Sequence, residues 1–247
     1  MTPPIAVSVV RDFAMYDRCL RTNPNCRGCT FAPLDNRVRN EGVPLKYNAF
    51  LDSRPADEDA WYVFCHEDFE PREPLLPRLE GLGTASLWGP IGARTRVRFG
   101  LYHEWQLVGR VAECAKDGSG EHELGRSVPP GTPVETFDCQ CLIVHSSLVR
   151  RQNLRFDEHL TFDLYVEDFC RTAAQRGIPS RILPFAACHW SGGHVLPRYY
   201  EQEAYLAKKY PNDCFTGTSS WILGGHPSMA RRMTVALKRF VRRLSRA

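Results

Sequence analysis

Two side chains able to bind a metal ion follow a short apolar stretch of the chain. Residues 61–65, Trp-Tyr-Val-Phe-Cys, are rich in strand-forming types, and His66 and Asp68 come directly after them. Such a buried strand delivers the next side chains to the carboxyl edge of its sheet, where open α/β sheets bind ligands. A carboxylate and an imidazole spaced two apart can face one divalent cation. The alternative is a polar loop after a core strand.

Two adjacent acids and a second histidine occupy comparable positions later in the chain. Glu167 and Asp168 open a segment that we expect to form a helix ending at Gly177. Acids in a first turn are favoured by the helix dipole, so this placement also has a purely structural explanation. His189 follows a predicted strand over residues 182–185.

The elements that would position these residues alternate between strands and helices. In order, we expect a strand over 5–10, a helix over 13–20 capped by Asp12, a strand over 30–34, a helix over 43–51 and the strand over 61–65. This alternation predicts an α/β fold with a mostly parallel central sheet flanked by helices. The glycine-rich residues 117–123 are predicted to form a mobile surface loop.

Length and composition indicate one globular domain. Of the 247 residues, 43% are hydrophobic and 24% charged, and no apolar run approaches the roughly 18 residues that span a bilayer. The first residues lack the features of a signal peptide, so the ten cysteines are expected to be reduced thiols in the cytoplasm. Cys26 and Cys29 have metal or redox spacing, but the sequence offers no second pair for zinc.

The C-terminal end is strongly basic. Residues 229–247 contain seven basic residues and no acid, although the whole chain has a net charge of only +4. The remaining chain is therefore mildly acidic, which argues against a broad nucleic-acid-binding surface. The apolar spacing in this segment predicts a basic amphipathic helix that lies on an anionic membrane surface. The alternatives are a helix packed on the body, a helix that binds another protein, and a disordered basic end.

The order of motifs resembles that of the family 2-like glycosyltransferases of the GT-A fold. The resemblance covers roughly residues 5 to 195 and rests on the order and spacing of the motifs together. In chain order they are Asp35-Asn36, Asn48, His66-x-Asp68, Gly89-Pro90-Ile91-Gly92, Val134 to Asp138, Leu154 to Glu158, Tyr165-x-Glu167-Asp168, Arg176-Gly177 and Cys188-His189-x-Ser191-Gly192.

The resemblance implies a role for each matching residue. Nucleotide-sugar binding would involve Arg11, Asp12, Asp35, Asn36, Asn48 and His66. Mn²⁺ or Mg²⁺ would be held against the diphosphate by Asp68, His66 and His189, with histidine standing where the family has the first acid of its Asp-x-Asp motif. Asp168, with Glu167 beside it in the catalytic motif, would be the general base of an inverting transfer, and Asp138 and Trp190 would face the acceptor.

We therefore expect a GT-A domain over residues 1–210 and a C-terminal extension over 211–247. The expected reaction moves a sugar from a nucleotide-sugar donor to a glycan or lipid-linked acceptor, in the cytoplasm at the inner face of the membrane. A sugar-phosphate nucleotidyltransferase is the enzymatic alternative, but it needs a glycine-rich loop where residues 10–13 read Val-Arg-Asp-Phe. The non-enzymatic alternative is a carbohydrate-binding or scaffold protein on the same fold.

Overall fold

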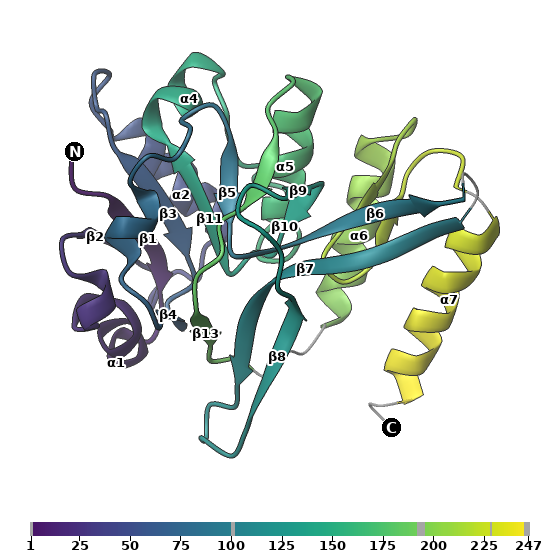
Figure 1. Ribbon diagram of the computed structural model, residues 1–247, viewed down its shortest axis with the longest axis horizontal. Helices are drawn as coiled ribbons and strands as arrows, with labels where there is room; N and C mark the ends of the chain where they lie inside the picture. The colour runs from purple at the N-terminus through teal and green to yellow at the C-terminus, as the bar shows by residue number, and fades with distance from the viewer. Residues whose placement is uncertain (1, 100–101, 192–195, 228, 245–247) are drawn as a thin grey trace.

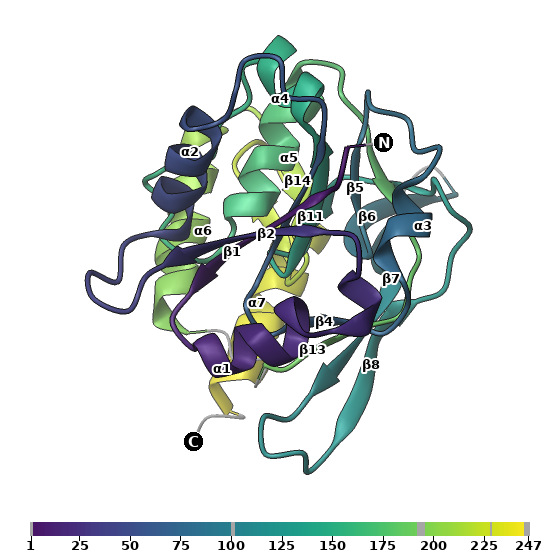
Figure 2. The ribbon, with the colours of Figure 1, turned by 90° about the vertical axis from the view of Figure 1, so that its left-hand side faces the viewer.

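The computed structural model shows an α/β fold built around two main sheets (Figures 1 and 2). It describes residues 2–99, 102–191, 196–227 and 229–244. The larger sheet has seven strands in the order β2-β1-β3-β11-β5-β12-β9. Their bounds are β1 Ile5–Val10, β2 Thr30–Asp35, β3 Trp61–Cys65, β5 Leu87–Gly89, β9 Pro133–Val134, β11 Cys141–His145 and β12 Ser180–Ile182.

Strand β3 shows why its sequence is a continuous apolar run. All five of its residues are buried. Tyr62 and Phe64 pack in the core cluster that includes helices α2 (Val43–Asp52), α4 (Ser146–Arg151) and α5 (Tyr165–Gln175). Trp61 and Val63 pack in the cluster on the opposite face. A strand covered on both faces needs apolar side chains at every position, which is the pattern observed.

The sheet is mixed, and the prediction of a mostly parallel sheet was wrong in this respect. β1 runs parallel to β2 and β3, as the strand-helix alternation predicted. β11, however, runs antiparallel to both β3 and β5, and β12 pairs parallel with β5 and antiparallel with β9. Local apolar runs do not encode strand direction, because a strand buried on both faces reads the same in either direction.

The predicted helices form, with one irregularity. The side chain of Asp12 accepts a hydrogen bond from the backbone N–H of Met15 (3.1 Å) and caps α1, Phe13–Tyr16, which continues as a π-helical segment, Asp17–Arg21. The other helices are α3 Leu75–Leu79, α6 Pro197–Lys209 and α7 Met229–Leu244.

A second sheet brings residues that are far apart in sequence next to one another. Its order is β10-β6-β7-β13-β4, with β8 paired to β7. The bounds are β4 Phe69–Pro71, β6 Ile91–Arg98, β7 Tyr102–Cys114, β8 Glu121–Arg126, β10 Thr136–Phe137 and β13 Ala187–His189. The glycine-rich segment is the tip of the β7–β8 hairpin, visible at the bottom of Figure 1. The parallel pairing of β13 with β7 sets His189 opposite Glu113.

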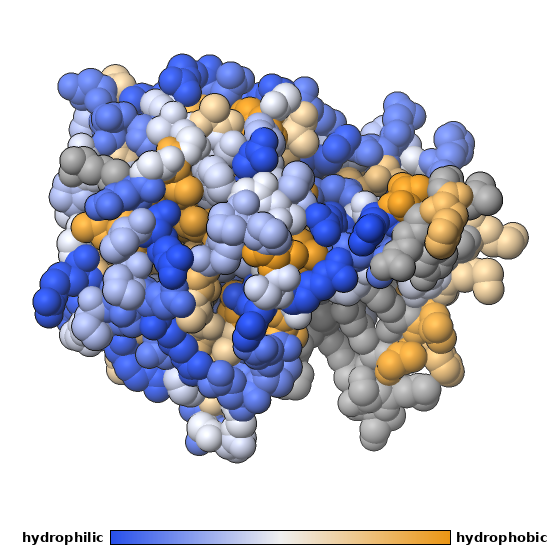
Figure 3. All heavy atoms as spheres, viewed as in Figure 1, coloured by the Kyte–Doolittle hydropathy of each residue, from blue (hydrophilic) through white to orange (hydrophobic). Residues whose placement is uncertain are grey.

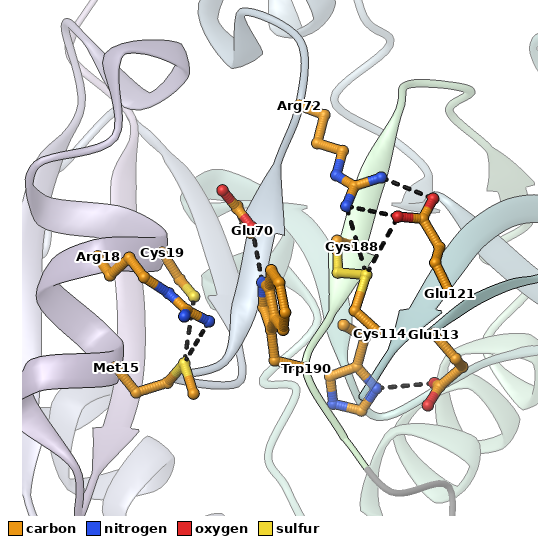
Figure 4. The surroundings of a disulfide bond; sticks show 11 residues. Met15, Arg18, Cys19, Glu70, Arg72, Glu113, Cys114, Glu121, Cys188 and Trp190 are labelled. Carbon is orange, nitrogen blue, oxygen red and sulfur yellow. Dashed lines mark hydrogen bonds and ion pairs between the residues drawn. A yellow bond between two sulfur atoms is a disulfide. The ribbon is translucent and has the colours of Figure 1, made fainter. Parts of the chain in front are cut away.

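Two cysteines join these strands, so the expectation of ten reduced thiols was wrong. Cys114 of β7 and Cys188 of β13 form a disulfide across a sequence separation of 74 residues (Figure 4). Arg72 and Glu121 form an ion pair beside it. The eight other cysteines, Cys26 and Cys29 among them, are free thiols.

The C-terminal segment starts with a hairpin fastened to the second sheet. Its strands are β14, Cys214–Thr216, and β15, Trp221–Leu223. The Glu135 carboxylate accepts hydrogen bonds from the backbone N–H groups of Thr95 (2.7 Å) and Thr216 (2.8 Å), which ties β14 to β6. The division of the chain at residues 210 and 211 stays a prediction.

Helix α7 follows the hairpin and carries exposed apolar side chains (Figure 3). They are Met229, Met233, Leu237, Phe240 and Val241. Residues 245–247 of the basic tail lie outside the described residues. Within the described parts of the chain, every helix is too short or too polar to cross a membrane.

Candidate active site

Three side chains of types able to hold a metal ion converge where the two sheets meet, and we call them the metal-binding cluster. His66 and Asp68 lie in the turn between β3 and β4, and His189 ends β13. One potential ligand atom from each lies within 4.8 Å of the others. His189 Nε2 is 3.3 Å from His66 Nδ1 and 3.3 Å from Asp68 Oδ1. A turn and a strand that are more than a hundred residues apart thus build one three-residue cluster.

Outer hydrogen bonds hold both imidazole rings in place. Glu113 Oε1 accepts a hydrogen bond from His189 Nδ1 (2.9 Å), which leaves Nε2 facing the cluster. Tyr165 donates its hydroxyl to the Cys139 carbonyl (2.9 Å), so its oxygen can accept from His66 Nε2, 3.2 Å away. His66 Nδ1 then faces the cluster. A metal-binding histidine usually donates its other ring N–H to an acceptor of this kind.

The charges of the cluster also suit a cation. Burial and the neighbouring His189 lower the pKa of His66 to about 4, so this ring is neutral at pH 7 and keeps a lone pair. Burial opposes ionisation of His189 and Asp68, but their mutual hydrogen bond and the contact with Glu113 outweigh it. The pKa of His189 is raised to about 10 and that of Asp68 is lowered to about 2. His189 is therefore protonated between the Asp68 and Glu113 carboxylates, and a divalent cation that binds its Nε2 would displace that proton. One carboxylate and two neutral imidazoles form a ligand set that fits such a cation.

A cavity of about 590 Å³, which we call the Arg11 cavity, opens on one side of the cluster. Its lining includes the cations Arg11, Lys116 and Arg198. Lys116 Nζ lies 3.6 Å from Asp68 Oδ2. The Glu67 carboxylate accepts hydrogen bonds from the backbone N–H groups of Arg11 and Asp12. These bonds join the end of β1 to the end of β3. The space combines cationic side chains with the metal-binding cluster.

The predicted nucleotide-sugar residues divide into two groups. Arg11, Asn36 and His66 line the Arg11 cavity. Asp12 caps α1, and exposed Asp35 forms an ion pair with Arg37. Buried Asn48 exchanges hydrogen bonds with the Phe156 backbone, a structural contact.

A second cavity of about 420 Å³, which we call the Glu167 cavity, also reaches His66 and His189. Asp138, Glu167 and Trp105 are among its lining residues. It shares His66, Phe162, His189 and Ser191 with the Arg11 cavity. The two spaces therefore meet at the metal-binding cluster.

Glu167 is a buried carboxylate at the wall of this second cavity. It is only 2% exposed and accepts hydrogen bonds from the Thr218 hydroxyl (2.8 Å) and the Cys139 thiol (3.3 Å). Burial, followed by the nearby charge of Asp138, raises the pKa of Glu167 to about 7. A carboxylate with this pKa can accept a proton near neutral pH.

Asp168 and Trp190, two further predicted site residues, have partners away from the cavities. Asp168 accepts hydrogen bonds from Lys209 (2.7 Å) and Tyr210 (2.7 Å), which tie α5 to α6. The Trp190 indole donates to Glu70, and Arg18 lies over its ring (Figure 4). Neither residue is among the described residues that line the two cavities.

The sequence did not point to Glu113 or Thr218 as site residues. It also did not point to Tyr165 as a partner of His66. Glu113 lies in the long strand β7 and Thr218 in the turn between β14 and β15. Tyr165 was noticed only as part of the Glu167-Asp168 motif. Their roles depend on contacts that span between 51 and 99 residues of sequence, which no local pattern reports.

No protein-family model matches the chain, and no curated protein matches it in sequence. Its structure is similar to the crystal structure of GalNAc-T7 with UDP, GalNAc and Mn²⁺, with a TM-score of 0.51 and 9% identity. The similarity covers 83% of this chain and 48% of GalNAc-T7, so the chain spans about half the length of that protein. Residues 1–349 of S. aureus TarS give a TM-score of 0.48 at 12% identity, with 99% of this chain and 72% of that one covered. A197 from STIV gives 0.40 at 12% identity, with 92% and 96% covered. The chain has the fold of the GT-A glycosyltransferases.

Proposed function

We propose that the chain is a metal-dependent glycosyltransferase. In this proposal it moves a sugar from a nucleoside-diphosphate sugar to a hydroxyl of a glycan or lipid-linked acceptor. The observation that carries the proposal is the meeting of two cavities at His66 and His189, two members of the cluster that Asp68 completes. A transfer reaction needs two substrates whose reacting atoms touch, and this arrangement provides one space for each. The GT-A fold supports the assignment, since the similar GalNAc-T7 structure contains UDP, GalNAc and Mn²⁺.

The donor would occupy the Arg11 cavity, with its diphosphate against the metal-binding cluster. Arg11, Lys116 and Arg198 supply positive charge for the phosphate oxygens. Asp68, His66 and His189 would hold Mn²⁺ or Mg²⁺, with Glu113 orienting His189 through the 2.9 Å hydrogen bond. The cation supplies Lewis-acid stabilisation of the negative charge that develops on the leaving diphosphate.

The acceptor would occupy the Glu167 cavity, and we assign the general base to Glu167 in preference to Asp168. Glu167 lines this cavity, whereas the carboxylate of Asp168 is engaged by Lys209 and Tyr210. The ionised Glu167 takes the proton from the acceptor hydroxyl as that oxygen attacks the anomeric carbon. Thr218 holds the carboxylate in place through its hydroxyl. Direct attack from the side opposite the leaving group would invert the anomeric centre.

A place at the cytoplasmic face of a membrane is part of the proposal. The exposed apolar side chains of α7, such as Met233 and Leu237, lie on a helix that is rich in arginine. Such a helix can insert its apolar side chains between lipids while its cations contact anionic headgroups.

Cation-dependent binding of a nucleotide tests the enzymatic assignment. The melting temperature would be measured with UDP and other nucleoside diphosphates, each with and without Mn²⁺. We expect at least one nucleotide to raise the melting temperature only when Mn²⁺ is present, because a ligand that binds the native state stabilises it. Asp68→Asn should remove this gain, and hydrolysis of the matching nucleotide sugar should then be measurable. A chain with no Mn²⁺-dependent gain for any nucleotide would be a scaffold or binding protein.

A further inference from the structure

The Glu167 cavity differs from the Arg11 cavity in the charges of its lining. The Arg11 cavity is lined by two arginines and a lysine. The lining of the Glu167 cavity, as far as the described residues show, contains no lysine or arginine. It contains carboxylates, of which Asp138 and Glu167 are examples. Asp163, another of its carboxylates, is paired with Arg198 of the Arg11 cavity at 2.8 Å.

The carboxylates of the Glu167 cavity offer only hydrogen-bond acceptors when they are ionised. Ionised carboxylates only accept hydrogen bonds. Asp138 accepts one through Oδ1, from the Gln140 backbone N–H (3.1 Å), so its capacity is only partly used. A ligand that complements these groups must donate hydrogen bonds, as sugar hydroxyls do. Phosphate and carboxylate groups are acceptors and carry the same charge sign as these carboxylates, against which the lining sets the protonated imidazole of His189.

Another part of the wall is aromatic and aliphatic. Trp105, Leu107, Leu124 and Tyr199 line the cavity. The Trp105 indole is fixed by a 2.9 Å hydrogen bond to the Gly217 carbonyl. Rigid aromatic rings offer a large apolar surface, which suits the C–H face of a sugar ring. The volume of about 420 Å³ lies within the usual range for small-molecule sites.

We propose that the Glu167 cavity takes an uncharged, hydroxyl-rich sugar as the reacting end of the acceptor, and rejects sugars that carry phosphate or carboxylate there. This inference rests on the proposed function and adds to it the chemical class of the acceptor. Charge at a distant part of a long acceptor is unaffected, because solvent screens it beyond about 10 Å.

The test compares matched glycans on full-length protein that is saturated with UDP and Mn²⁺. Each mono- or disaccharide of the panel is used as the neutral sugar, its phosphate ester and its uronic acid, and binding is measured by saturation-transfer NMR. UDP occupies the Arg11 cavity and prevents phosphate esters from binding there. We expect at least one neutral sugar to bind about tenfold or more tighter than its two anionic forms, as for like charges brought together in a partly buried space.

Two variants test whether the cavity wall causes the preference for neutral over anionic sugars. Asp138→Lys should reduce the ratio of the affinity for the neutral sugar to the affinity for its phosphate ester by about tenfold, because it replaces a repelling charge with an attracting one. Asp117→Asn, at the exposed tip of the β7–β8 hairpin, should leave the ratio unchanged. Equal or tighter binding of the anionic sugars, binding of no sugar, or an unchanged ratio in Asp138→Lys would overturn the inference. Failure of UDP and Mn²⁺ to bind would overturn the proposed function, and this inference with it.

Discussion

Glu167 and Asp168 are neighbours in sequence, yet they face different parts of the molecule. Consecutive residues of an α-helix point about 100° apart, so one carboxylate can line a cavity while the next fastens two helices together. Glu167 contacts Thr218 at the cavity, and Asp168 contacts Lys209 of α6 and Tyr210, which follows that helix. The two acids should therefore respond differently to the same loss of charge.

Removing each charge separates the two roles. Glu167→Gln should lower sugar transfer by roughly 10²–10⁴-fold, the usual contribution of a positioned base, with donor binding retained. Asp168→Asn should lower the free energy of unfolding by about 1–3 kcal/mol, because Lys209 loses one of its two carboxylate partners and keeps only Asp157, and leave more activity than Glu167→Gln. Transfer rate, UDP affinity and chemical denaturation would be measured for both variants. An inactive but fully stable Asp168→Asn protein would show that Asp168, and not Glu167, is the general base.

The raised pKa of Glu167 predicts two opposite pH dependences. Transfer should increase as pH rises through about 7, because the base must be ionised. Stability should decrease over the same change: between the ordinary pKa of 4.5 and about 7, the folded protein holds a proton that the unfolded chain has lost. Glu167→Gln should remove this part of the pH dependence of unfolding. Denaturation curves at pH 5 and pH 8 for both proteins check it, and an identical pH dependence in the two would contradict the assignment.

Glu113 should affect the affinity for the metal although it is not one of the proposed ligands. Its carboxylate holds His189 Nδ1, so Glu113→Gln should weaken Mn²⁺ binding by roughly 10- to 100-fold, as loss of an outer hydrogen bond to a metal-binding histidine usually does. Glu123→Gln on the neighbouring strand β8 is the control, because its carboxylate pairs with exposed Arg110. Isothermal titration with Mn²⁺ and UDP would measure both. Equal affinities in the two variants would assign Glu113 a role in folding alone.

At the scale of elements, the sequence predicted the strand that precedes His66 and Asp68 but not the strand that bears His189. In place of the strand expected over residues 182–185 the chain forms two short strands, Ser180–Ile182 and Ala187–His189. The apolar run before His66 and the alternation of strands and helices predicted β1, β2 and β3 and the edge where the cluster lies. The antiparallel insertion of β11 and the pairing of β13 with β7 depend on long-range packing, and Glu113 reaches His189 only through that pairing. The disulfide between Cys114 and Cys188 follows from the same pairing.

The β14–β15 hairpin is the element through which the C-terminal segment reaches the cavity. Its turn supplies Thr218, whose hydroxyl donates to Glu167 and so lowers the pKa of that carboxyl against the larger effect of burial. Thr218→Val keeps the shape and removes the donor, so the midpoint of the pH–rate profile should move upward from about 7. Thr218→Ser should restore the profile. An unchanged midpoint in Thr218→Val would show that the hydroxyl only stabilises the turn.

The whole molecule presents its most exposed apolar helix at the C-terminal end. Helix α7 contacts the body through Arg231, which lies over the Trp221 ring, and through buried Val235. Met233 and Leu237 remain 65% and 62% exposed. In the proposed placement at a membrane, these exposed apolar side chains would contact the lipid surface, while Arg231 and Val235 hold the helix on the body.

Replacing Met233, Leu237 and Phe240 with serine should therefore reduce binding to anionic vesicles while donor hydrolysis persists. These three side chains are exposed, and their replacement spares the contacts of Arg231 and Val235 with the body. Each lost apolar side chain removes roughly 1 kcal/mol or more of insertion free energy, so the triple variant should bind at least about tenfold more weakly. Val38→Ser is the control, because Val38 is 93% exposed and lies far from α7 in the sequence. Sedimentation with phosphatidylserine-containing and neutral vesicles would measure binding. If the triple variant and the parent bind anionic vesicles equally, α7 is not the membrane contact. Its exposed side chains would then be assigned to contact with another protein.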